Sequence, residues 1–81
     1  MEINFSRHAK RRMLLYQIEE NDVIETIKAY VADKALTAGK QEFVDKAMSQ
    51  KYGYPLKIAF SKENDKIVVI TAYPLRRGRR L

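Results

Sequence analysis

The chain has 81 residues, enough for one domain, and its 46% hydrophobic content is normal for a folded globule. It contains no cysteine, which excludes disulfides and thiolate zinc sites and favours the reducing cytoplasm as its location. No apolar run approaches the about 20 residues that a membrane-spanning helix needs, so we expect no membrane association.

The net charge is +6, and the cations are concentrated in two places. The first cluster is Arg7, Lys10, Arg11 and Arg12, and the second is Arg76, Arg77, Arg79 and Arg80. The acidic residues gather elsewhere, over 19–25, and such separation indicates a cationic face for a polyanion. Arginine outnumbers lysine in both clusters and binds phosphate through two parallel hydrogen bonds. The alternative is a basic surface that only maintains solubility.

In chain order, the first predicted element is a short strand over Glu2–Phe5, where polar and apolar residues alternate. Ser6 is a favourable helix N-cap, so a helix is predicted over 7–16. Its core face consists of Ala9, Met13 and Tyr16. His8 and Arg12 are four residues apart and therefore stack as neighbours on an adjoining face.

A second helix is predicted to begin at the acidic residues 19–22, which favour the positive end of the helix dipole, and to end near Asp33. Its apolar stripe is Val23, Ile27, Tyr30 and Val31. The segment 41–50 is ambiguous because it also fits helical spacing. We interpret it as a strand that covers the hairpin after it.

The hairpin is predicted from two β-prone segments, Leu56–Phe60 and Lys66–Tyr73, on either side of a polar turn at 61–65. The second segment is apolar on both faces, which places it inside the sheet. The whole of 1–81 is therefore expected to be one α+β domain, with a short N-terminal strand and two helices packed on one face of a small antiparallel sheet. A basic tail at 76–81 follows and is expected to order on binding.

Several of these residues together resemble a known family. The run Phe5-Ser6-Arg7-His8-Ala9 with Arg12-Met13, followed by Ile18 and Val23, resembles a Ser-x-His-Ala-x-x-Arg-Met helix and an Ile-x-x-x-x-Val second helix. The last strand, Ile67–Tyr73, ends in Thr-Ala-Tyr before basic residues. This pattern is similar to the domain-of-unknown-function 4258 family. The resemblance implies the RelE/ParE-like toxin fold, whose wider relatives include bacterial ribonuclease toxins.

Metal-independent RNA cleavage needs a base for the ribose 2′-hydroxyl proton, cations for the charge on phosphorus, and an acid for the leaving 5′-oxygen. His8, the only histidine, lies among cations that favour its neutral, proton-accepting form. Arg12, one turn later, is placed to hold the scissile phosphate. Tyr73 would act as a stabilised phenolate or stack on a base, with Thr71 on the same face.

Each of these three residues also has a structural interpretation. His8 could hydrogen-bond the sheet, Arg12 could pair with the acids at 19–22, and Tyr73 could close the hydrophobic sheet. The residues expected to contact phosphate rather than react are Arg7, Lys10, Arg11, Arg76, Arg77, Arg79, Arg80 and, if its face is open, Lys57. No carboxylates have metal-ligand spacing in the strands, so no metal or cofactor is expected.

The leading hypothesis is a toxin-like, metal-independent endoribonuclease that acts on RNA, for example at the ribosome. An acidic antitoxin that folds on binding would be its partner. The alternatives are a nucleic-acid-binding module without turnover and a ParE-like inhibitor of a protein target such as gyrase. The fold alone does not decide among them.

Overall fold

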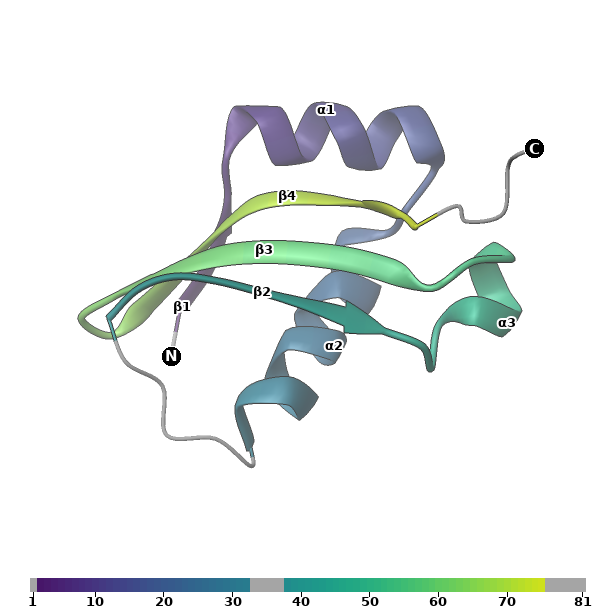
Figure 1. The fold of residues 1–81 in the computed structure, drawn as a ribbon. Coiled ribbons are helices and arrows are strands. Elements are labelled where there is room, and N and C mark those ends of the chain that lie inside the picture. The colour runs from purple at the N-terminus through teal and green to yellow at the C-terminus, as the bar shows by residue number, and fades with distance from the viewer. Residues whose placement is uncertain (1, 33–37, 76–81) are drawn as a thin grey trace.

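The computed structural model describes residues 2–32 and 38–75, which form a mixed four-stranded sheet and three helices (Figure 1). The elements in chain order are β1 (Glu2–Phe5), α1 (Arg7–Tyr16), α2 (Glu20–Ala32), β2 (Gly39–Asp45), α3 (Ser49–Tyr52), β3 (Leu56–Glu63) and β4 (Lys66–Pro74). The strand order across the sheet is β1-β4-β3-β2. The chain is therefore α+β, as the sequence predicts.

The position of β4 inside the sheet is confirmed, because β1 and β3 both pair with it. The predicted antiparallel sheet is wrong in one respect, since β1 runs parallel to β4, with Ile3 beside Ile67 and Phe5 beside Val69. The parallel orientation leaves Phe5 beside the middle of β4. The chain then continues alongside β4 as α1 (Figure 1).

The prediction of a strand over 41–50 is wrong in its second half. The strand β2 ends at Asp45, whose carboxylate accepts a hydrogen bond from the Met48 backbone N–H at 3.2 Å and turns the chain. The short helix α3 follows and ends at Gly53, whose φ of 82° is a left-handed conformation that glycine adopts without strain. The predicted end of α2 at Asp33 and the tail at 76–81 lie outside the described residues.

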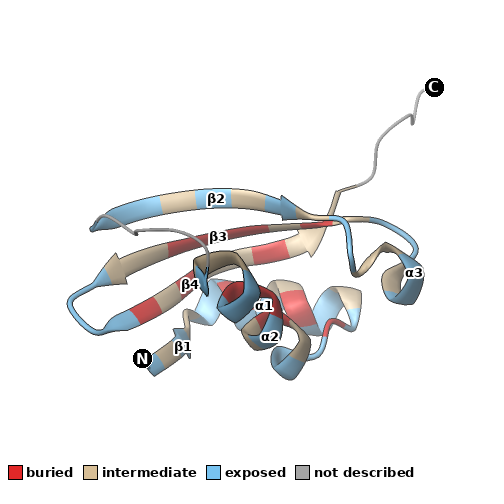
Figure 2. Cartoon of the chain, turned by 90° about the horizontal axis from the view of Figure 1, so that it is seen from below, coloured by how far each residue is buried: buried red, intermediate tan, exposed pale blue. Residues whose placement is uncertain are grey.

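Both long helices contribute buried residues to one hydrophobic core, α1 from beside β4 and α2 from behind the sheet in the view of Figure 1. Ala9 and Met13 of α1 and Ile27 of α2 join Phe60 and Val69 in a single buried cluster. Figure 2 shows the buried residues along β3 and β4 and on the helices. Of the helices in the described part of the chain, none has the length and apolar character to cross a bilayer.

Ser6 fixes the start of α1 against β4. Its hydroxyl oxygen accepts a hydrogen bond from the Ala9 backbone N–H at 3.0 Å, which caps the helix as predicted. The same hydroxyl donates to the Ile70 carbonyl of β4 at 3.1 Å, and the Ser6 N–H donates to the Val69 carbonyl at 2.9 Å. One residue therefore sets both the helix start and its position along β4.

A β-bulge in β4 changes which residues face away from the hydrophobic core. Ala59 of β3 pairs with Thr71 and the next residue, Phe60, pairs with Val69, so Ile70 is an extra residue. Val69 faces the core, and without the bulge Thr71 and Tyr73 would face it too. The bulge moves them to the opposite face, which we call the outer face. Its β3 and β4 residues are Lys57, Ala59, Ser61, Val68, Thr71 and Tyr73.

Candidate functional site

The cations of α1 form an exposed positive surface along the helix. Arg7, Lys10 and Arg11 are exposed, and Arg12 is partly buried. We call these four residues the α1 cationic surface. Within residues 2–32 and 38–75, none of the four is in a salt bridge, whereas Lys51 and Lys57 both are. Within the described residues, no ion pair therefore neutralises the α1 cationic surface.

A pocket of about 240 Å³ lies on one side of this surface. Its lining residues are His8, Arg11, Arg12 and Leu15, which follow the spacing i, i+3, i+4 and i+7 of one helix side. His8 is exposed, and in the part of the chain that the structure describes it forms no hydrogen bond with the sheet. The interpretation of His8 as a sheet anchor is therefore wrong, and its imidazole is accessible beside two guanidinium groups.

Arg12 connects this pocket to the sheet. Its guanidinium carbon lies 5.1 Å from the centroid of the Tyr73 ring, a cation–π contact. Two of the acidic residues considered as salt-bridge partners of Arg12 pair with Lys51 instead. The Lys51 Nζ lies 3.4 Å from Glu19 Oε2 and 2.7 Å from Asp22 Oδ2. Arg12 is thus a common neighbour of His8 in the pocket and of Tyr73 on β4.

Tyr73 lies on the outer face, directly across from Lys57 of β3. It is partly exposed and is not among the residues that pack against the hydrophobic core. Tyr16 and Tyr30, by contrast, pack against the core as predicted. The phenol of Tyr73 is therefore placed at the edge of the sheet next to α1.

Lys57 shares the outer face with Tyr73, but its charge is partly neutralised. Its Nζ lies 3.3 Å from Glu42 Oε1, and its side chain is 28% exposed. Thr71 is also on this face, and its hydroxyl oxygen is buried without a hydrogen-bond partner among the described residues. Lys57 is therefore a weaker candidate for phosphate contact than the α1 cations.

Arg12 therefore lies next to His8 in the pocket and next to Tyr73 on β4. Arg7, Lys10 and Arg11 are on the same helix as Arg12. The predicted phosphate contacts Arg76, Arg77, Arg79 and Arg80 lie outside the described residues. Sequence reasoning missed Leu15 as a member of the pocket. Its spacing of seven residues from His8 is the signal that places it there.

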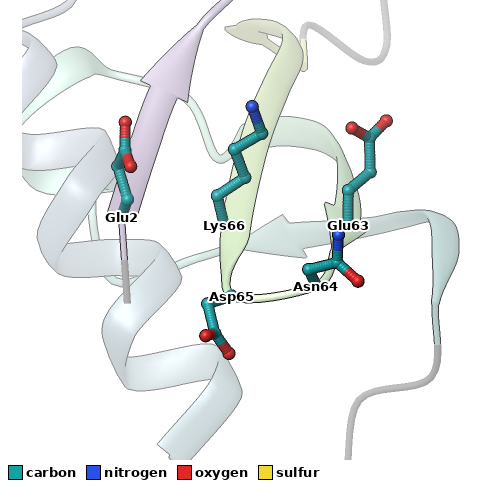
Figure 3. A pocket seen from close by; sticks show the side chains of 5 residues that line it. All are labelled: Glu2, Glu63, Asn64, Asp65 and Lys66. Atoms are coloured by element: carbon teal, nitrogen blue, oxygen red, sulfur yellow. The ribbon is translucent and has the colours of Figure 1, made fainter.

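A second, larger pocket of about 400 Å³ lies at the β3–β4 turn (Figure 3). It is lined by Glu2, Glu63, Asn64, Asp65 and Lys66. The side chain of Lys66 lies between those of Glu2 and Glu63, its neighbours on the flanking strands. Three carboxylates against one ammonium repel a polyanion. In the described ranges no group of three or more His, Asp or Glu residues could hold a metal ion.

A charged cluster joins α3 to the start of α2. The Tyr52 hydroxyl accepts a hydrogen bond from the Glu19 backbone N–H at 3.1 Å and donates one to Asp22. The hydrogen bond from Lys51, and then that from Tyr52, hold the pKa of Asp22 below its ordinary value of 3.8. Burial, and then the bond to Asp22, raises the pKa of Tyr52. The cluster fixes α3 at the end of the sheet opposite to the acidic pocket (Figure 1).

Comparison with known proteins gives one match. The model of the family described as a domain of unknown function, DUF4258, matches residues 5–74. These residues include the three helices, the strands β2, β3 and β4, and the last residue of β1. No curated protein and no solved structure matches the chain.

Proposed function

The chain belongs to the DUF4258 family, and we propose that it is a toxin-like, metal-independent endoribonuclease that binds RNA along the α1 cationic surface. His8, Arg12 and Tyr73 are the proposed catalytic residues. The observation that carries the proposal is the contact of Arg12 with Tyr73 at 5.1 Å, combined with the pocket that Arg12 shares with His8. Arg12 is thereby a neighbour of both the proposed base, His8, and the proposed proton donor, Tyr73.

The proposed reaction uses the 2′-hydroxyl of the RNA itself. The His8 imidazole takes the proton of that hydroxyl, and the 2′-oxygen forms a bond to phosphorus. Arg12 stabilises the negative charge that develops on the phosphate oxygens. The bond from phosphorus to the 5′-oxygen breaks, and the Tyr73 hydroxyl donates a proton to that oxygen. The products carry a 2′,3′-cyclic phosphate and a 5′-hydroxyl.

The order of elements also supports a RelE/ParE-like toxin fold as part of this proposal. The described elements are a strand, two helices and then three strands of the same sheet, with the short helix α3 between the first two of these three strands. The α1 cationic surface suits an acidic antitoxin that would cover the same surface and block RNA. The proposed antitoxin is therefore a competitor of RNA for α1.

The direct test is incubation of purified protein with total RNA in EDTA. We expect cleavage by the wild-type chain, and a loss of at least about 100-fold in His8→Ala and in Arg12→Ala. Lys28→Ala is the matched control, because Lys28 is an exposed cation on α2 that does not line the pocket. It should cleave at the wild-type rate.

Two results would contradict the proposal in different ways. Intact RNA together with tight, salt-sensitive binding would leave a binding module without turnover. Intact RNA together with blocked DNA supercoiling would favour the ParE-like inhibitor of gyrase.

A further inference from the structure

One residue that lines the pocket on α1 is a leucine that does not pack in the hydrophobic core. Leu15 is 71% exposed, yet it lines the pocket together with His8, Arg11 and Arg12. We infer that this pocket is a subsite for one unpaired nucleotide, whose base lies on Leu15 and the arginine planes. This inference rests on the proposed function and names the form of its substrate, single-stranded nucleic acid.

The chemistry of the lining suits a nucleotide better than a free anion. Two guanidinium groups and an imidazole offer flat faces on which a base can stack, and the same guanidinium groups donate hydrogen bonds to phosphate. Leu15 adds an apolar surface that a phosphate or sulfate would not use. A base with its attached phosphate uses both kinds of contact at once.

The volume of the pocket is compatible with a nucleobase. At about 240 Å³ it has room for a group of that size. Bases in a duplex are stacked and paired, and the deep major groove of A-form RNA hides their edges. An unpaired base can enter a pocket on the side of a helix without the cost of breaking a base pair.

The rest of α1 argues against a lipid surface as the occupant. Its exposed large apolar residues are Leu14 and Leu15, at the last turns, and the earlier exposed positions are charged or polar. A helix that lies in a membrane interface needs an apolar face along its length. The cations of α1 match the phosphates of a strand that runs along the helix towards Leu15.

Leu14 and Leu15 make a matched pair for the test. They are adjacent and both exposed, at 82% and 71%, but only Leu15 lines the pocket. The full chain is titrated into a fluorescent single-stranded DNA of mixed sequence, which has no 2′-hydroxyl and cannot be cleaved by the proposed route. We expect Leu15→Ala to weaken binding about fivefold to tenfold, the scale of one lost base contact, and Leu14→Ala to change it less than twofold.

Two further probes locate the contact. A strand of the same length with abasic sites should bind wild type and Leu15→Ala equally, because the base is missing. A duplex of the same sequence should bind more weakly than the single strand and show no dependence on Leu15. Neither variant removes a buried side chain, so both should unfold at the wild-type urea concentration.

The inference is overturned if Leu15→Ala and Leu14→Ala have the same effect, or if Leu15→Ala weakens duplex and abasic binding as much as single-strand binding. Binding to anionic vesicles that needs Leu15, without preference for single strands, would also overturn it. If RNA is cleaved but the affinity for single strands does not depend on Leu15, the subsite is contradicted and the proposed nuclease activity stands. If the affinity depends on Leu15 but RNA stays intact, the nuclease activity is contradicted and the subsite stands.

Discussion

Tyr73 has two separable parts, a ring and a hydroxyl. The ring lies under the Arg12 guanidinium at 5.1 Å and holds it beside the pocket. The hydroxyl is the proposed proton donor for the leaving oxygen. Because the two parts have different functions, substitution can remove one and keep the other.

Tyr73→Phe should keep the contact with Arg12 and lose the donor. We therefore expect RNA cleavage to fall about 100-fold while the affinity for single-stranded DNA is unchanged. Tyr73→Leu, which also removes the ring, should weaken both cleavage and binding. Single-turnover cleavage and fluorescence anisotropy measure the two effects, and wild-type cleavage by Tyr73→Phe would remove Tyr73 from the proposed mechanism.

Asp22 contributes stability that depends on pH. Its pKa in the folded chain is lowered by Lys51 and Tyr52, so its contribution is full above the unfolded value of 3.8. The contribution is lost as the pH falls through the lower folded pKa. Asp22→Asn should therefore be less stable than wild type at neutral pH, and the difference should shrink below about pH 4.

Urea unfolding at a series of pH values measures this difference. Glu25→Gln is the matched control, because Glu25 is exposed on the same helix and is in no salt bridge among the described residues. The free energy of unfolding of Asp22→Asn could instead stay below that of wild type by the same amount down to pH 2. That result would show that the charge of Asp22 does not stabilise α3 against α2.

At the scale of elements, the join between β1 and α1 decides where the site forms. Ser6 caps α1 and also donates to the Ile70 carbonyl at the bulge, so the helix start is tied to the part of β4 that turns Tyr73 outward. Arg12, six residues after Ser6, then meets Tyr73, three residues after Ile70. The site depends on this pairing of a cap with a bulge.

Ser6→Ala should lower the free energy of unfolding by about 1–2 kcal/mol, because it removes the cap and the hydrogen bond to Ile70. Ser6→Thr retains a hydroxyl and should lose less than half as much. Urea denaturation reports both values. Equal stability of Ser6→Ala and wild type would mean that the backbone bond from Ser6 to Val69 alone positions α1.

The elements that could be predicted from the sequence are those set by local patterns. The Ser6 cap, the spacing of Ala9 and Met13, and the alternation at Leu56–Phe60 gave α1 and the hairpin because neighbours in sequence determine them. The parallel pairing of β1, the bulge at Ile70 and the docking of α3 depend on contacts between distant residues. No local pattern encodes these contacts.

The same distinction applies to the site. His8 and Arg12 could be placed together from their spacing on one helix, and Thr71 with Tyr73 from their spacing on one strand. That Arg12 would contact Tyr73 could not be derived, because the bulge reverses the face that strand alternation from Val69 assigns to Tyr73. Leu15 was overlooked because an exposed leucine is ordinary until its neighbours are known.

Over the whole molecule, the α1 cationic surface and the acidic pocket have no residue in common. The α1 cationic surface lies along β4, and the acidic pocket at Glu2, Glu63 and Asp65 lies at the β3–β4 turn. A polyanion is attracted to the first and repelled from the second, so a strand is expected to lie along α1 and to end away from the turn.

The most direct test of this account is the chemistry of the RNA ends left by the wild-type chain in EDTA. The account predicts fragments with 2′,3′-cyclic phosphate and 5′-hydroxyl ends, and none when His8 is replaced by alanine. Fragments with 5′-phosphate ends, equal cleavage by His8→Ala, or intact RNA at all protein concentrations would contradict it.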